Sequence, residues 1–179
     1  MSNEELVQLI PEFGAISDEN LREKALVVWA EALETGGWIV ADLAEMPFTL
    51  LTEGVQVSLA EHVSTVARLC LAMDNVLREA YGERYLGDRD ILLAGALLAD
   101  VGKLIEFKRE DGRYQWAGMY QYLRHPFTGV ALAYKHGLPE AVMHIIATHS
   151  WEGDKFKRRP ESIIFHHADF KDFDLAKAR

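Results

Sequence analysis

The stretch that decides the fold is Leu97-Leu98-Ala99-Asp100-Val101-Gly102-Lys103, in which a carboxylate and a lysine close an apolar run. The segment before it, from about Asp90, is apolar nearly all round, which predicts the central and fully buried helix of a bundle. A carboxylate at the end of such a helix is costly to desolvate unless a cation, a metal ion or strong hydrogen bonds face it. Asp100 therefore marks a polar site inside an apolar body.

Four further residues of metal-ligand type each lie next to a segment with a helical pattern; they are His62, His125, His149 and Asp169. A helical bundle gathers metal ligands from remote points of the sequence in this way. Imidazole and carboxylate groups together bind divalent ions such as Mn, Fe, Co, Ni or Zn without selecting among them. The sequence therefore predicts a site for a divalent transition metal.

Helical patterns account for most of the chain. Ser17-Asp18 predict an N-cap and Gly36-Gly37 a stop, and the capping box of Ser58 and Glu61 opens a helix that runs to about Tyr81. The buried stripe of this second helix is expected at Val63, Val66, Ala67, Cys70, Met73, Val76 and Leu77. Further helices are expected from about Asp90 to Asp100, from His125 to Gly137, from Leu138 to about Thr148, and from about Pro160 onward.

The strand signal is confined to one place. An Asp-Gly turn within Arg109-Glu110-Asp111-Gly112 separates two short alternating segments, Leu104 to Phe107 and Tyr114 to Trp116, which predicts a small β-hairpin laid on the bundle. The expected fold class is therefore all-α, a helical bundle with a small β-hairpin insertion.

Length and composition bound the class of protein. A chain of 179 residues, 49% hydrophobic and 26% charged, fits one globular domain. The acidic N-terminus and the lack of a long apolar run predict a cytoplasmic protein without a membrane partner. A formal net charge of -9 opposes binding to a nucleic acid polymer, so an anionic substrate needs a local positive site. The single cysteine, Cys70, excludes a disulfide framework and is expected to be a buried structural thiol.

The order of the ligand-type residues, with Asp-Val-Gly-Lys at the second position, resembles the HD-domain metal-dependent phosphohydrolase superfamily. The resemblance covers about Ser58 to Phe173, with local support from Leu123-Arg124-His125-Pro126, Ala147-Thr148-His149 and Phe165-His166-His167-Ala168-Asp169. It implies an HD-domain helical bundle: one HD-type domain over residues 1–179, with an N-terminal helical extension over 1–57 and the HD core over 58–173.

The resemblance also implies residue roles. One metal ion would be held by His62, Asp100 and Asp169, and a second by Asp100, His125 and His149. Asp100 would orient the metal centre, and Lys103 matches a lysine that contacts the scissile phosphate in some members of the superfamily. Arg124 is a further candidate for contact with an anion, because its guanidinium group suits phosphate oxygens.

Ala99 departs from the superfamily pattern, in which an adjacent His-Asp pair contributes two ligands. Alanine has no donor atom, so its presence is expected to weaken the first metal site, and if the second site is intact the protein would still bind one ion there. Ala99 is either a natural departure or a deliberate substitution that inactivates an enzyme. The completeness of the remaining pattern favours a substitution.

Three functions fit these features. The leading one is a metal-dependent phosphohydrolase that acts on a small organic phosphate or nucleotide. The second is a di-iron oxygenase of the same fold, of the inositol-cleaving or phosphonate-cleaving type, and the third is a non-catalytic binding module.

The N-terminal fifty residues, with Trp29 and Trp38, could cover the pocket, pack on the bundle or form a dimer contact, and the apolar surface favours a homodimer. His166 and His167 could approach the pocket or lie outside it, and the basic residues of 155–159 are either a solvated face or a means of steering phosphate.

Overall fold

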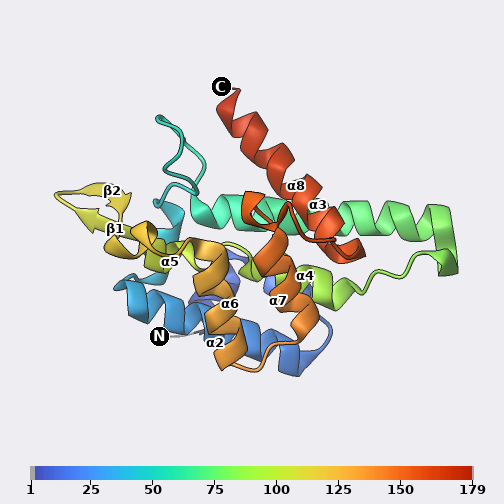
Figure 1. Cartoon of the computed structure of the whole chain (residues 1–179). Coiled ribbons are helices and arrows are strands. Elements are labelled where there is room, and N and C mark those ends of the chain that lie inside the picture. The colour runs from blue at the N-terminus through green and yellow to red at the C-terminus, as the bar shows by residue number, and fades with distance from the viewer. Residues whose placement is uncertain (1–2, 179) are drawn as a thin grey trace.

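The computed structural model describes residues 3–178 and shows a helical bundle that carries a small two-stranded β-hairpin (Figure 1). The expected fold class is confirmed. The α-helices are α1 (Asn3–Leu9), α2 (Glu19–Gly36), α3 (Leu59–Tyr81), α4 (Arg89–Leu98), α5 (Lys103–Glu106), α6 (His125–Lys135), α7 (Glu140–Thr148) and α8 (Pro160–Lys177). Short 3₁₀ helices are η1 (Pro11–Ala15), η2 (Val40–Ala44), η3 (Gly82–Arg84), η4 (Gly118–Gln121) and η5 (Trp151–Gly153). Within residues 3–178, no helix is both long and apolar enough to cross a membrane.

Helix α4 is the centre of the bundle, as its apolar sequence predicts. It begins where the Asp88 side chain accepts a hydrogen bond from the Ile91 backbone N–H, and every residue from Leu92 to Leu98 is buried. Helices α2, α3, α7 and α8 all pack against it. The turn that follows α4 therefore places Asp100 deep in the molecule, where 4% of its surface is exposed.

Helix α3 begins at the predicted capping box, in which the Ser58 hydroxyl accepts from the Glu61 backbone N–H and the Glu61 carboxylate accepts from Ser58. The predicted stripe is buried as far as Cys70, but Val76 is 64% exposed, so its predicted burial is wrong. The C-terminal part of α3 extends beyond the bundle (Figure 1), and the side chain buried there is Asp74. Two arginines bind this carboxylate, at 2.8 Å from Arg78 Nε and 2.8 Å from Arg89 Nη2.

We expect Asp74→Asn to lower the free energy of unfolding by about 2 kcal/mol at pH 7, since it removes the charge that pairs with two half-exposed arginines. Burial of Asp74 disfavours its charged form, but hydrogen bonds led by that of Arg78 hold the pKa of its carboxyl below the ordinary 3.8. A depressed folded-state pKa stabilises the fold above pH 3.8, and this contribution is lost as the pH falls through the folded-state value. Urea unfolding between pH 7 and pH 3 should show the difference between parent and variant shrinking below about pH 4. A difference that stays constant down to pH 3 would contradict this assignment.

The hairpin consists of β1 (Phe107–Glu110) and β2 (Arg113–Trp116), paired antiparallel with Phe107 opposite Trp116. Asp111 at φ 49° and Gly112 at φ 72° form the predicted two-residue turn, in which both residues are left-handed. The prediction of a strand at Leu104 to Glu106 is wrong. Backbone hydrogen bonds continue from the turn after α4, with the Glu106 N–H donating to the Gly102 carbonyl, so residues 103–106 form α5.

The N-terminal segment packs on the same core and also reaches the site. The Trp29 indole donates to the Leu97 carbonyl at 2.8 Å, and the Trp38 indole donates to the Leu104 carbonyl at 2.8 Å. Beyond η2 the chain contributes Phe48 to the cavity described below. The N-terminal segment thus packs on the bundle and also contributes to the wall of the cavity. Its third possible role, a dimer contact, remains a prediction.

Candidate metal and phosphate site

Side chains from four helices converge on Asp100, which lies in the turn after α4. His62 lies in the first turn of α3, His125 begins α6, His149 directly follows α7, and Asp169 lies on α8. Ligand atoms of Asp100, His125 and His149 all lie within 4.8 Å of one another, and so do those of His62, Asp100 and Asp169. The structure therefore brings together all five residues that the sequence proposed as ligands, in two groups that share Asp100.

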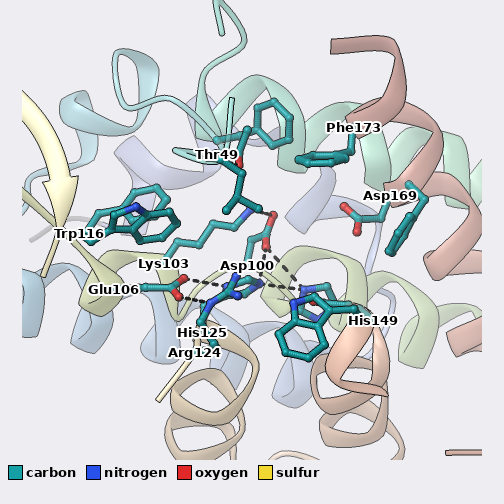
Figure 2. A pocket seen from close by; sticks show the side chains of 16 residues that line it. Thr49, Asp100, Lys103, Glu106, Trp116, Arg124, His125, His149, Asp169 and Phe173 are labelled. Carbon is teal, nitrogen blue, oxygen red and sulfur yellow. Dashed lines mark hydrogen bonds and ion pairs between the residues drawn. The ribbon is translucent and has the colours of Figure 1, made fainter. Parts of the chain in front are cut away.

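The separations within the two groups suit a small cation. Asp100 Oδ1 lies 3.4 Å from His125 Nε2 and 3.7 Å from His149 Nε2, and these two nitrogens are 3.1 Å apart (Figure 2). In the other group, His62 Nε2 lies 3.1 Å from Asp100 Oδ2 and 3.1 Å from Asp169 Oδ1. Each Asp100 oxygen thus faces a different group, so Asp100 would be the ligand common to both groups if each held an ion.

The three histidines all present the same ring nitrogen to the site. The opposite nitrogen, Nδ1, is held in each case by an oxygen: Asp172 Oδ2 at 2.7 Å from His62, Glu106 Oε2 at 2.8 Å from His125, and the Ile146 carbonyl at 2.7 Å from His149. An Nδ1–H that donates to such an acceptor leaves the Nε2 lone pair free to bind a metal. The donor set of three imidazoles and two carboxylates therefore fits divalent transition-metal ions.

Two of the proposed ligands, His149 and Asp100, have the charges that metal ligands need. Burial and the nearby His125 lower the pKa of His149, which keeps it in the neutral form that can bind a metal. Burial disfavours the charged form of Asp100, but Lys103 and His62 hold the pKa of its carboxyl well below its usual range. Burial would also lower the pKa of His62, yet the surrounding carboxylates, Asp100 first, raise it to about 10. Without a cation, His62 is therefore protonated and its charge balances these carboxylates, and a bound metal ion would displace the proton on Nε2.

Two cationic side chains line the cavity beside the ligand groups. Lys103 is buried, with 8% of the residue exposed, and its Nζ lies 2.8 Å from Asp100 Oδ2. Arg124 Nε lies 2.5 Å from Glu106 Oε1, and its guanidinium carbon lies 5.2 Å from the centre of the Tyr120 ring. These are the local positive groups that an acidic chain needs in order to bind an anion.

Two contributors to the site were not found from the sequence. Asp172 follows Asp169 by three residues on α8, and this spacing puts both on one helix face, so the signal was available. Glu106 lies in a segment that the sequence pattern predicts as a strand. The structure shows that it shares one helical turn, α5, with Lys103, and the strand prediction does not indicate this proximity.

The ambiguous residues lie outside the ligand groups. His166 Nδ1 contacts the His149 carbonyl at 2.8 Å, so its role is to support the end of α7, and His167 is exposed. In the basic segment, Arg158 Nε donates to the Thr148 carbonyl at 2.8 Å and thereby anchors the loop after His149.

Glu106 is the side chain that connects the cationic and metal-binding parts of the site. Its two oxygens serve two partners, Arg124 and His125, and the residue is 1% exposed. Glutamine has one acceptor oxygen in place of two, so Glu106→Gln retains one of these contacts and loses the other. We expect the affinity for Mn²⁺ or Zn²⁺ to fall by about 10- to 100-fold, because a neutral amide is a weaker acceptor for His125 than a carboxylate even where it keeps that contact.

Isothermal titration calorimetry with each metal measures this effect, and the exposed Glu110→Gln on the hairpin is the matched control. Equal affinities for the Glu106 variant and the control would show that metal binding by His125 does not depend on the charge and the two acceptor oxygens of Glu106.

Comparison with known proteins identifies a relative. The chain is similar to the dihydroneopterin 2′,3′-cyclic phosphate phosphodiesterase of Methanocaldococcus jannaschii, with 34% identity over 165 residues. The alignment takes in 88% of this chain and 64% of that protein, so the chain spans somewhat less than two thirds of the relative's length. No family model matches the chain. No solved structure matches it either.

Proposed function

We propose that this chain is a metal-dependent phosphohydrolase that cleaves a phosphodiester bond in a small organic phosphate. The observation that carries the proposal is the pair of ligand groups joined by Asp100, with three histidines that each direct Nε2 inward. Two cations beside these groups, Lys103 and Arg124, suit an anionic substrate. The relative's name adds support, since it describes hydrolysis of a cyclic phosphodiester.

The chemistry follows from the placement of the residues. Divalent ions held by the two groups would supply an activated water molecule and polarise the phosphoryl oxygens. Asp100 keeps the two groups in one arrangement because each of its oxygens faces a different histidine set. Lys103, oriented by its contact with Asp100, offers its ammonium group to the negative charge that builds on the phosphoryl oxygens, and Arg124 offers a second cation. Glu106 and Asp172 hold the imidazoles in the tautomer that can bind metal.

The decisive test combines metal analysis with substrate screening. The purified chain is stripped with EDTA, reloaded separately with Mn²⁺, Fe²⁺, Co²⁺, Ni²⁺ or Zn²⁺, and assayed on guanosine 2′,3′-cyclic phosphate and on p-nitrophenyl phosphate. We expect metal-dependent opening of the cyclic diester. Oxygen consumption by the iron form without release of a phosphate monoester would favour the oxygenase instead. Binding without turnover in every metal form, and also after residue 99 is changed to histidine, would favour the binding module.

Ala99→His is expected to strengthen the group formed by His62, Asp100 and Asp169. The superfamily that the sequence resembles has a histidine ligand at the position of the buried Ala99, so an imidazole there is expected to supply a fourth donor to that group. We expect the second equivalent of Mn²⁺ to bind at least about tenfold more tightly and kcat/KM to rise, because two ions act together on a phosphoryl group. Ala99→Leu adds comparable bulk without a donor atom and is the control. An equal gain in both variants would show that residue 99 does not act as a ligand.

A homodimer in the cytoplasm remains part of the proposal. Sedimentation equilibrium of the whole chain checks the oligomeric state.

A further inference from the structure

Aromatic side chains gather around the cavity that contains the ligand groups. Of the eight phenylalanines and four tryptophans in the chain, six line it: Phe48, Phe107, Trp116, Trp151, Phe170 and Phe173. They come from the segment after η2, from α8, from η5 and from the hairpin, and Figure 2 shows Trp116 and Phe173 to either side of Asp100. Among the described residues that line the cavity, Leu51 is the one aliphatic side chain.

These aromatic residues divide into two kinds. Phe48 and Phe107 are buried and have packing roles, because Phe48 stacks on His62 with ring centres 4.3 Å apart and Phe107 meets the Trp116 ring edge-on at 5.3 Å. Trp151 and Phe170, by contrast, line the cavity and are 63% and 36% exposed, and the Phe170 ring also contacts the His166 ring with centres 4.4 Å apart. Core packing does not explain large apolar rings left in water, and such surface beside a polar cavity is typical of a ligand contact.

We propose that Trp151 and Phe170 form a subsite for a planar heteroaromatic group carried by the phosphate ester. The inference rests on the proposed function, which puts the phosphoryl group beside Asp100 and Lys103. A ligand that satisfies the whole cavity has an anionic end for Lys103 and Arg124 and a flat apolar end for the exposed rings. An alkyl or lipid phosphate fits less well, because the wall offers aromatic rings and one leucine where an acyl chain would need several aliphatic side chains.

The first test compares two cyclic diesters that differ in the ring alone. Guanosine 2′,3′-cyclic phosphate carries a fused heterocycle, and glycerol 1,2-cyclic phosphate carries none. We expect Trp151→Ala and Phe170→Ala each to lower kcat/KM for the guanosine ester about tenfold more than for the glycerol ester, through a higher KM. Phe156→Ala is the matched control, since Phe156 is 66% exposed and lies outside the residues lining the cavity. Equal losses on both esters would overturn the inference.

The second test needs neither metal nor turnover. Saturation-transfer NMR with guanosine, in the presence of EDTA, reports contact between the purine H8 proton and the protein. We expect the signal in the parent chain and in the Phe156→Ala control, and its loss in the Trp151→Ala/Phe170→Ala double variant. A signal that persists in the double variant would overturn the subsite. If neither ester is hydrolysed, the proposed function fails, while the NMR result still decides whether a planar ring binds here.

Discussion

Asp100→Asn is expected to abolish metal binding in both ligand groups and to lower kcat/KM by about a thousandfold or more. Asp100 is the one residue that both groups contain, and asparagine keeps its shape while removing the negative charge and one acceptor oxygen. Removal of a ligand that belongs to a single group, as in Asp169→Asn, should leave the group of Asp100, His125 and His149 able to bind one ion. Mass spectrometric metal analysis and cyclic diester hydrolysis measure the two effects.

The Asp100 variant also has a stability cost, which the experiment must separate from the loss of activity. Lys103 is 8% exposed and loses its carboxylate partner, so the free energy of unfolding should fall by about 3 kcal/mol. Assays therefore run at a temperature at which circular dichroism shows the variant folded. The exposed Asp174→Asn on α8 serves as the control. Two equivalents of metal bound by a folded Asp100→Asn would show that Asp100 does not join the groups.

Gly102→Ala is the second change with a large expected effect, because it acts on backbone packing. A Cβ at position 102 would lie 2.2 Å from the His125 carbonyl oxygen and 2.5 Å from Thr128 Oγ1. The first of these contacts is with backbone, so the start of α6 must move and His125 moves with it. We expect a loss of about 3 kcal/mol in the free energy of unfolding, at the upper end for an overpacked core, and a fall of at least about tenfold in metal affinity.

Gly118→Ala isolates the effect of the close approach from that of replacing any glycine. A Cβ at position 118 would meet no atom within 4 Å, and its φ is not positive, so this variant should match the parent in stability and metal affinity. Urea unfolding and calorimetric titration with Mn²⁺ compare the three chains. If the Gly102 and Gly118 variants behave alike, the turn after α4 does not determine the position of His125.

The elements found correctly from the sequence are those whose signals are local. The apolar run into Asp100 marked the buried α4, the Ser58 and Glu61 pair marked the start of α3, and the Asp111-Gly112 turn marked the hairpin. The errors arose where tertiary packing overrides a local pattern. Residues 104–106 are predicted to belong to a strand but continue a helical turn. Val76 keeps the helical spacing of the buried stripe, although this part of α3 extends beyond the bundle.

The sequence by itself determined the helical fold class and the chemical types, order and helical positions of the five proposed ligands, because capping, periodicity and turn signals act over a few residues. Only the tertiary structure decided that these side chains meet, that each Asp100 oxygen faces a different group, and that Glu106 and Asp172 hold the histidine rings. His62 and Asp172 are 110 positions apart, and no local pattern encodes a 2.7 Å contact over that separation. The contact exists because α3 and α8 pack on one another and on α4, so the side-chain geometry of the site depends on how the whole core closes.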